Sequence, residues 1–367
     1  MEPLVSVIVP VYNTGRVLKT CLDSLANQTL ADIEIIVIDD ASTDGSPKII
    51  EACAASDSRF RLMKNTENQN LYETRRRGFA AAQGYYIATC DSDDYMPPSA
   101  LERLYETARR TEADIVHGHS YQFINGRQFG WPINSPFKVS RGGSYVESFL
   151  RYRRGWTVWG KLYHRSVMEK ALTELPVNKR LFAGEDLLFS FFLGLKAGRY
   201  IGCPAVVYHY RFSTDNFYKQ PDKWPQNIAD YFHVLGTIKA RLEKKELLPE
   251  YDLLFEGLIK KDVAEVFSNL PDGADLALAR DLITEHLGKP YLIALYGEDF
   301  SRSPLGNDYG AAGKALFPAR LILFALIQLW KLGFYEFAVC FRHVLALIRR
   351  DGFKYALEKL RQKIKVR

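Results

Sequence analysis

The sequence predicts an α/β fold built on an open, mostly parallel sheet. Over the first 120 residues, short β-branched apolar runs alternate with segments of helical periodicity. Continuous apolar runs such as 5–10 and 33–38 are typical of strands buried on both faces, as in a parallel sheet. Polar or acidic residues follow three of these strands directly, and ligands of such sheets bind beyond the carboxyl ends of the strands.

The elements are predicted in a regular order along the first part of the chain. The first helix, 16–27, carries Val17, Leu18, Cys21, Leu22 and Leu25 at helical spacing. The turn residues 42–46 offer an N-cap to the second helix. The predicted strands are 5–10, 33–38, 60–63, 85–89 and 113–118, and the predicted helices are 16–27, 47–55, 72–83 and 101–110.

Beyond residue 120 the pattern changes. Tryptophans and glycines over 120–215 predict an irregular, aromatic-lined region, and a helical pattern begins at Asn227. We therefore expect three parts: a catalytic domain at 1–220, a helical accessory region at 221–315 and a basic amphipathic helical tail at 316–367.

Composition favours a protein of the cytoplasm. The 47% hydrophobic and 25% charged residues are ordinary for a globular domain. The five cysteines are scattered and form no CxxC pair, which favours a reducing compartment. The first apolar run is interrupted by Pro10 and Asn13, so it reads as a strand rather than a signal peptide. With no uninterrupted run of the length that a membrane span needs, we expect no transmembrane helix.

The basic charge is concentrated at the end of the chain. Residues 342–367 hold nine Lys or Arg and two Asp or Glu, while the whole chain has a net charge of +6. The tail could be a solvated helical surface, a contact with an anionic membrane, or a surface for a polyanionic acceptor. A membrane contact would give a peripheral location at the inner face of the cell membrane. We expect no nucleic acid partner, because no aromatic and basic residues interleave as in RNA-binding modules.

An acidic cluster follows the strand 85–89. Asp91 and Asp93 stand one residue apart on the loop that leaves it. Two such oxygen ligands suit a divalent cation whose remaining positions are filled by water and phosphate oxygens. An isolated DxD is more often a solvated turn, but here Asp39-Asp40 also ends a strand. Two acidic strand ends in one sheet suggest a nucleotide.

These motifs together resemble the family 2 glycosyltransferases with the GT-A fold. The segments VSVIVPVYN, IEIIVIDDASTDGS and DSDD carry the resemblance, which covers roughly residues 4–215. It implies a nucleotide-sugar donor bound through Pro10, Tyr12, Asn13, Asp39, Asp40, Asn68, Arg75, Arg76, Asp91, Ser92 and Asp93. Asp91 and Asp93 would bind Mn²⁺ or Mg²⁺. The segment NQNLYETRRRG lacks the family's paired glycines, so either Arg75 or Arg76 could face the nucleotide.

The resemblance also identifies a candidate base. Glu185-Asp186 begins an apolar helical run, and by itself it could be only an acidic first turn favoured by the helix dipole. In the family, an ED pair follows a segment like Trp159-Gly160-Lys161-Leu162-Tyr163, which implies Asp186 as general base and Glu185 as an orienting group. His209 and Arg211 match basic positions near the diphosphate. Trp156 and Trp159 could stack on the acceptor sugar or lie in the core.

The resulting expectation is a metal-dependent, inverting glycosyltransferase that uses a UDP-sugar. It would add a single sugar to a hydroxyl of a surface glycan, a lipid-linked acceptor or a polyanionic acceptor; no QxxRW motif of processive synthases is present. Two alternatives stay open: a polyprenyl-phosphate glycosyltransferase of the same fold, and a non-catalytic module that binds nucleotide sugars.

Overall fold

The structure is a computed structural model that describes residues 2–124, 127–134, 145–146, 156–211, 224–244 and 276–287. All of these residues belong to one compact unit, residues 1–292. The basic tail predicted at 316–367 lies outside the described residues, and the domain boundaries at 220 and 315 stay predictions. None of the helices in the described ranges is long and apolar enough to cross a membrane.

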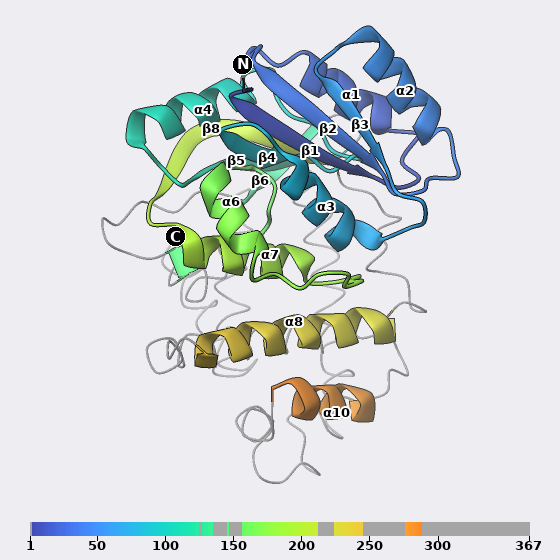
Figure 1. The fold of residues 1–367 in the computed structure, drawn as a ribbon, viewed down its shortest axis with the longest axis vertical. Coiled ribbons are helices and arrows are strands. Elements are labelled where there is room, and N and C mark those ends of the chain that lie inside the picture. Colours follow the sequence, from blue (N-terminus) through green and yellow to red (C-terminus); the bar gives the residue numbers. More distant parts are fainter. Residues whose placement is uncertain are drawn as a thin grey trace, which may run out of the picture. The chain divides into compact units, whose positions relative to one another are not determined.

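The described strands form one mixed sheet (Figure 1). Its parallel half has the order β3-β2-β1-β4, and the sheet continues through β7, β5 and β6, while β8 pairs with β5 in parallel. Strand β7 is antiparallel to both of its neighbours. The strands are β1 Val5–Val11, β2 Ile33–Asp39, β3 Phe60–Lys64, β4 Tyr86–Thr89, β5 Ile115–Ile124, β6 Arg127–Asn134, β7 Lys161–His164 and β8 Tyr200–Arg211.

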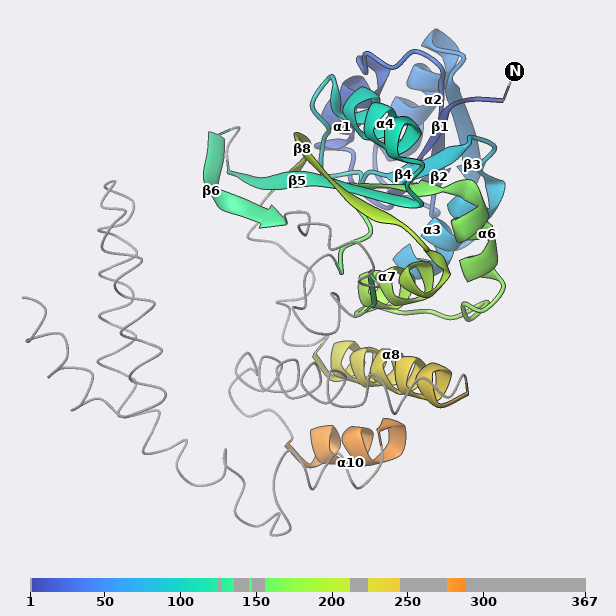
Figure 2. The ribbon, with the colours of Figure 1, turned by 90° about the vertical axis from the view of Figure 1, so that its left-hand side faces the viewer.

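Helices cover both faces of this sheet. In Figures 1 and 2, α1, α2 and α4 lie on one side, whereas α3, α6 and α7 lie on the other. Alternate residues of β1, from Val5 to Val11, pack with α1 and α4, because successive side chains of a strand point to opposite faces. The helices are α1 Leu18–Ala26, α2 Ser46–Ser56, α3 Asn70–Ala81, α4 Ala100–Thr111, α6 Arg165–Leu172, α7 Glu185–Lys196, α8 Trp224–Lys244 and α10 Leu276–His286.

Helix α3 packs unusually close to the sheet at Gly78. A Cβ atom there would lie 2.4 Å from Cγ2 of Ile8 in β1 and 2.8 Å from Cδ1 of Ile38 in β2. Arg75 precedes Gly78 by three residues, so the two residues share one face of the helix. The close approach therefore brings Arg75 toward the carboxyl ends of the parallel strands.

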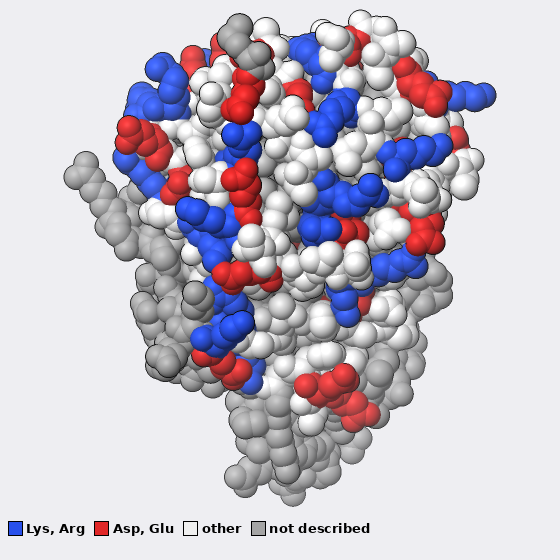
Figure 3. All heavy atoms as spheres, in the orientation of Figure 1, with Lys and Arg blue, Asp and Glu red and all other residues white. Residues whose placement is uncertain are grey.

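The surface carries charges of both signs. On the face that Figure 3 shows, Lys and Arg side chains are interspersed with Asp and Glu side chains over the described residues. This mixture agrees with the near-neutral balance that the sequence has outside its basic tail.

The strands and helices predicted between residues 5 and 118 are confirmed, with shifted ends. Helix α3 begins at Asn70, two residues before the predicted start, and β5 extends to Ile124. The irregular region predicted at 120–215 is wrong for its described part, where 161–211 form β7, α6, α7 and β8. The aromatic side chains there pack inside the fold: Trp159 stacks on Tyr208 of β8, with ring centroids 4.7 Å apart.

The contact at Gly78 gives a stability prediction. Gly78→Val should lower the free energy of unfolding by about 1–3 kcal/mol, because the added methyl groups overpack Ile8 and Ile38. Chemical denaturation measures the change. Gly45→Ala is the matched control, since nothing lies within 4 Å of its new Cβ. Equal stability of Gly78→Val and wild type would show that α3 does not pack this closely.

Candidate active site

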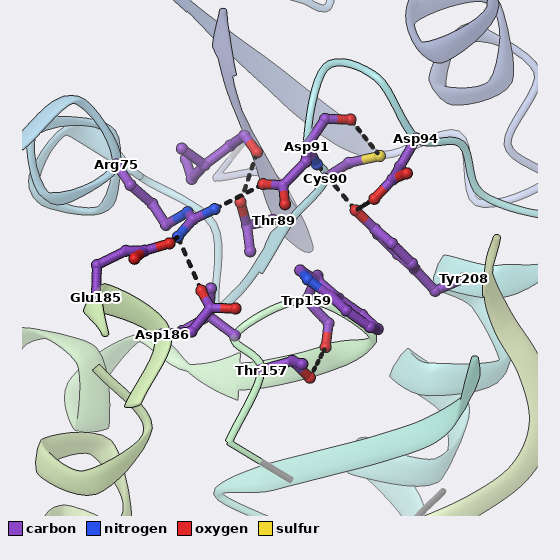
Figure 4. A network of polar contacts seen from close by, with 12 residues as sticks. Arg75, Thr89, Cys90, Asp91, Asp94, Thr157, Trp159, Glu185, Asp186 and Tyr208 are labelled. Atoms are coloured by element: carbon purple, nitrogen blue, oxygen red, sulfur yellow. Dashed lines mark hydrogen bonds and ion pairs between the residues drawn. The ribbon is translucent and has the colours of Figure 1, made fainter. Parts of the chain in front are cut away.

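The candidate site lies where the end of β4, helix α3 and the start of α7 meet (Figure 4). Its centre is Arg75, whose side chain is completely buried. Nη2 of Arg75 donates to Oδ1 of Asp91 at 2.6 Å, and Nη1 donates to Oδ1 of Asp186 at 2.9 Å. Oε1 of Glu185 lies 3.7 Å from the same Nη1. One guanidinium group thus joins the acidic turn after β4 to the acidic pair on α7.

The charge of Arg75 is held in place by these carboxylates. Burial by itself would lower the pKa of Arg75, but the negative charges of Asp91, Asp186 and Glu185 raise it above its usual value. Arg75 is therefore a permanent cation inside the site.

The acidic pair is positioned by the start of α7. Gly184 caps the helix with a left-handed backbone, φ 82°, and Glu185 and Asp186 form its buried first turn. Burial raises the pKa of both carboxyls, to about 8 for Glu185 and about 6 for Asp186. The positive charge of Arg75, which bonds Asp186 directly, opposes the rise of the Asp186 pKa. Of the two carboxyls, Asp186 is therefore the one whose ionised form Arg75 supports by a direct hydrogen bond.

A buried hydrogen-bond network fixes the acidic turn. The Tyr208 hydroxyl donates to Oδ2 of Asp94 at 2.7 Å and accepts from the backbone N–H of Asp91 at 3.0 Å. The backbone N–H of Arg211 donates to the other oxygen of Asp94, at 2.7 Å. Burial and the neighbouring carboxylates raise the pKa of Asp94. Asp94 and Tyr208 thus hold the backbone of the turn, and the carboxylates of Asp91 and Asp93 are left for contacts with a ligand.

The acidic turn fits a divalent cation. Asp93 is open to solvent, yet the surrounding protein and the negative charge of Asp91 raise the pKa of its carboxyl to about 6. A cation between the two carboxylates would remove this repulsion. Within the described ranges, no three His, Cys, Asp or Glu residues gather into a complete metal site. Such an ion would therefore take its other ligands from water and phosphate oxygens.

The two aspartates that end β2 have different surroundings. Asp40 is fully used by the protein: it accepts from the backbone N–H groups of Gln69 at 2.7 Å and Asn70 at 3.0 Å, where α3 begins. Asp39 accepts from the backbone N–H of Ser42 through Oδ1, at 3.0 Å. Its buried Oδ2 has no hydrogen-bond partner among the described residues. Asp39 is therefore the better placed of the two to accept a hydrogen bond from a ligand.

The other candidates for nucleotide binding near the ends of β1 and β4 differ in exposure: one ring is open to solvent, and the rest are buried or bonded within the protein. Tyr12 is 50% exposed just beyond β1. Asn13 has a positive φ of 53° and accepts from the backbone N–H of Thr43 at 2.8 Å, so it ties the ends of β1 and β2 together. Pro10 is buried inside β1, and Ser92 is buried with its hydroxyl accepting from Thr14 at 3.1 Å. Tyr12 is thus the member of this group whose ring is open to a ligand.

The arginines of α3 point to different places. Arg76 forms a two-contact ion pair with Glu73 one turn earlier, at 2.6 and 2.9 Å, and takes no part in the Arg75 cluster. Asn68 accepts from the backbone N–H of Asn70 at 3.2 Å, at the helix start. Of the two arginines left open by the sequence, Arg75 is the one that the fold brings to the acidic groups.

Two basic residues come from the end of β8. The ring of His209 lies between Phe123 and Tyr95, at centroid distances of 4.1 and 4.8 Å, and burial lowers its pKa to about 4. Its Nδ1 and the Nε of Arg211 have no hydrogen-bond partner among the described residues. The positive charge of Arg211 acts to lower the pKa of Asp93, against the raising effect of burial. Both residues thus lie by the acidic turn with donor or acceptor atoms to spare.

The two tryptophans considered for acceptor binding, Trp156 and Trp159, differ in how far they are buried. Trp159 is 7% exposed and stacks on Tyr208 and Tyr210 of β8, which places it in the core. Trp156 is 42% exposed, and its carbonyl accepts from the hydroxyl of Ser190 on α7 at 2.7 Å. Of the two rings, Trp156 is the one that an acceptor could reach.

Three site residues were not assigned from the sequence: Asp94, Lys161 and Tyr208. Asp94 stands at the end of the motif DSDD, but only the fold shows that Tyr208 bonds to it. Lys161 is 1% exposed, and burial lowers its pKa to about 7. Its place in the segment Trp159-Gly160-Lys161-Leu162-Tyr163, which the family resemblance had singled out, was the signal that could have drawn attention to it.

Comparison with known proteins confirms the resemblance. Residues 6–174 match the model of "Glycosyl transferase family 2". EpsH of Bacillus subtilis (strain 168), whose name places it among the glycosyltransferases, is 33% identical over 253 residues, or 68% of this chain and 72% of that protein. The poly(ribitol-phosphate) beta-glucosyltransferase of Bacillus spizizenii is 31% identical over 64% of this chain, which spans 37% of that protein.

Solved structures show the same fold. The crystal structure of S. aureus TarS residues 1–349 in complex with UDP-GlcNAc has a TM-score of 0.61 and 19% sequence identity, covering 80% of this chain and 84% of that chain. At this identity the likeness concerns the fold. Together with the family match, it shows that the protein is a glycosyltransferase with the GT-A fold and belongs to glycosyl transferase family 2.

Proposed function

We propose that the protein is a metal-dependent, inverting transferase that moves one sugar from a UDP-sugar to a hydroxyl of a surface-glycan or lipid-linked acceptor. The observation that carries the proposal is the buried bridge of Arg75 between Asp91 and Asp186. It keeps a donor-side carboxylate and a candidate base in one cluster, as a single displacement requires.

Asp186 is the general base in this proposal. A sugar hydroxyl is a weak nucleophile, so a carboxylate within hydrogen-bond reach must take its proton while the new bond forms at the anomeric carbon. The hydrogen bond from Arg75 favours the ionised form of Asp186 and orients its oxygens. Glu185, with its raised pKa, keeps a proton and can donate a hydrogen bond to the acceptor sugar.

The donor would bind at the ends of β1, β2 and β4. The free oxygen of Asp39 can accept a hydrogen bond from an N–H of the uracil ring, and the exposed ring of Tyr12 can stack on that uracil. Asp91 and Asp93 would hold Mn²⁺ or Mg²⁺. When bound, such an ion stabilises negative charge on the departing diphosphate. His209 and Arg211 are placed to bind that diphosphate from the side of β8.

The proposed acceptor site rests on the exposed ring of Trp156 and on the name of one relative. The exposed indole of Trp156 offers a stacking surface near α7. One relative acts, by its name, on poly(ribitol-phosphate), which is a polyanion. A polyanionic acceptor would suit the basic residues of 342–367. We infer a location in the cytoplasm, peripheral at the inner face of the cell membrane, where the basic residues of 342–367 would meet anionic lipids.

The base assignment predicts a large loss of activity in Asp186→Asn. The amide keeps the shape of the side chain but cannot take a proton, so kcat should fall by about 10²–10⁴-fold. Release of UDP from the UDP-sugar, with and without acceptor, measures it. Glu169→Gln, an exposed carboxylate on α6, is the control and should act as wild type. Undiminished activity of Asp186→Asn would refute Asp186 as the base, whereas a wild type without transferase activity would favour the alternative of a binding module.

The raised pKa of Asp186 predicts a pH dependence. The base works only when ionised, so kcat should be constant at neutral pH and fall as the pH drops through about 6. Asp93 has a similar pKa, so donor binding must be measured over the same range. A fall that appears in kcat/KM for the donor but not in kcat would belong to donor binding and not to Asp186.

The donor site predicts a metal-dependent stabilisation by UDP. At about 100 times its Kd, UDP with Mn²⁺ should stabilise the fold by roughly 2.7 kcal/mol in thermal unfolding. Asp93→Asn should lose the part of this stabilisation that depends on Mn²⁺. Asp39→Ala should lose the part of the stabilisation that UDP gives without the metal. Asp23→Asn, in an exposed ion pair on α1, should keep both. No shift with UDP, or an equal shift with other nucleoside diphosphates, would contradict uridine as the donor base.

A further inference from the structure

Lys161 is a buried cation that the proposed chemistry does not yet use. It is the first residue of β7, and 1% of its surface is exposed. A lysine is almost never buried without a partner, because removing its charge from water is costly. Its surroundings therefore indicate what the charge is there to do.

The ammonium group holds the segment 156–160 against the start of α7. Nζ of Lys161 donates to the carbonyl of Thr157. The hydroxyl of Ser190 on α7 donates to the carbonyl of Trp156 at 2.7 Å, and that of Tyr163 donates to the carbonyl of Val158 at 3.0 Å. The segment is thus fixed from β7 and from α7 at once.

This segment is bonded to the helix that carries the candidate base. Ser190, one turn after Asp186 on α7, donates to the carbonyl of Thr157 at 3.4 Å as well as to that of Trp156. Because Lys161 binds the same carbonyl of Thr157, its contact reaches α7 through one shared backbone group.

Lys161 and Asp186 also interact through their charges. The positive charge of Lys161 lowers the pKa of Asp186, and the negative charge of Asp186 opposes the lowering of the Lys161 pKa by burial. The other charged or titratable groups that act on Asp186, or that it acts on, come from α3, the turn after β4, α7, β7 and residue 145: they are Arg75, Asp91, Glu185, Tyr163 and Tyr145. Arg75 and Lys161 are the two cations of this set.

We propose that Lys161 is a positioning residue for glycosyl transfer: it fixes segment 156–160 against the start of α7, which carries Asp186, and places a second buried positive charge near this base. The inference rests on the proposed function, since it requires Asp186 to be the base. In this proposal two residues support the base: Arg75, which also holds the donor-side Asp91, and Lys161, which binds the segment next to α7.

The test compares the pH profiles of kcat for wild type, Lys161→Met and Lys196→Met. Lysine and methionine have similar lengths, so Lys161→Met removes the charge and the hydrogen bond with little change in packing. The acid limb of its kcat profile should move up by about one pH unit, which makes the loss at pH 6 about fivefold larger than at alkaline pH and the loss at pH 5 about tenfold larger. KM for the donor should not change, because the carbonyl that Lys161 binds belongs to segment 156–160 and not to the acidic turn.

Lys196→Met is the matched control. Lys196 lies at the other end of α7 and pairs with Glu174, so its loss should lower stability without moving the pH profile. A profile of Lys161→Met that coincides with wild type would overturn the inference. An equal loss of kcat at every pH would also overturn it, since that result indicates a structural role alone.

A second measurement does not depend on the folding of a Lys161 variant. In protein labelled at the lysine side-chain carbons, NMR titration should show one lysine that loses its proton near pH 7. In Asp186→Asn, where the opposing negative charge is gone, this lysine should titrate at lower pH. An unchanged titration would show that the two charges do not interact.

The outcomes separate the two proposals. If Asp186→Asn keeps full activity, the proposed function fails, whatever Lys161 does. If Asp186→Asn is inactive and Lys161→Met has the pH profile of wild type, the proposed function stands and the role of Lys161 is rejected.

Discussion

The buried guanidinium of Arg75 is the interaction on which the candidate site depends. Asp91, Glu185 and Asp186 come from two elements far apart in the sequence, and without a cation their charges would repel one another in a region of low dielectric. Arg75 offers them a planar set of donors that can bond two carboxylates at once. Removing one partner of such a buried network leaves an uncompensated charge. The end of β4, helix α3 and the start of α7 are therefore held together by one side chain.

The position of Arg75 depends in turn on how α3 is fixed to the sheet. Asp40 caps the beginning of the helix from the end of β2, and Gly78 lets the helix lie directly on Ile8 and Ile38. The two aspartates at the end of β2 thus have separate functions. Asp40 builds the helix that carries Arg75, and Asp39 keeps one oxygen without a protein partner. A single acidic dipeptide contributes both to the scaffold and to the ligand-facing surface.

Around this centre, other polar groups hold the acidic residues from outside the cluster. Tyr208 and Asp94 fix the turn that carries Asp91, and Lys161 binds a backbone segment that Ser190 of α7 also holds. Asp94 belongs to the acidic turn itself, whereas Tyr208 comes from β8 and Lys161 from β7, two strands of the sheet beyond β4. Precise placement of a base requires such supports, because small displacements cost much of the rate.

The sequence by itself determined the alternating parallel half of the fold, the acidic strand ends, the family and the pair Glu185-Asp186. These features are local, because hydrophobic periodicity and residues at strand ends are readable in short windows of the chain. The tertiary structure decided which of two arginines meets the acidic groups, which of two aspartates keeps a free oxygen and which tryptophan is open. It also revealed Lys161 and the strands within 161–211. All of these depend on burial and on contacts between segments distant in the sequence, and no local pattern encodes a distance across the fold.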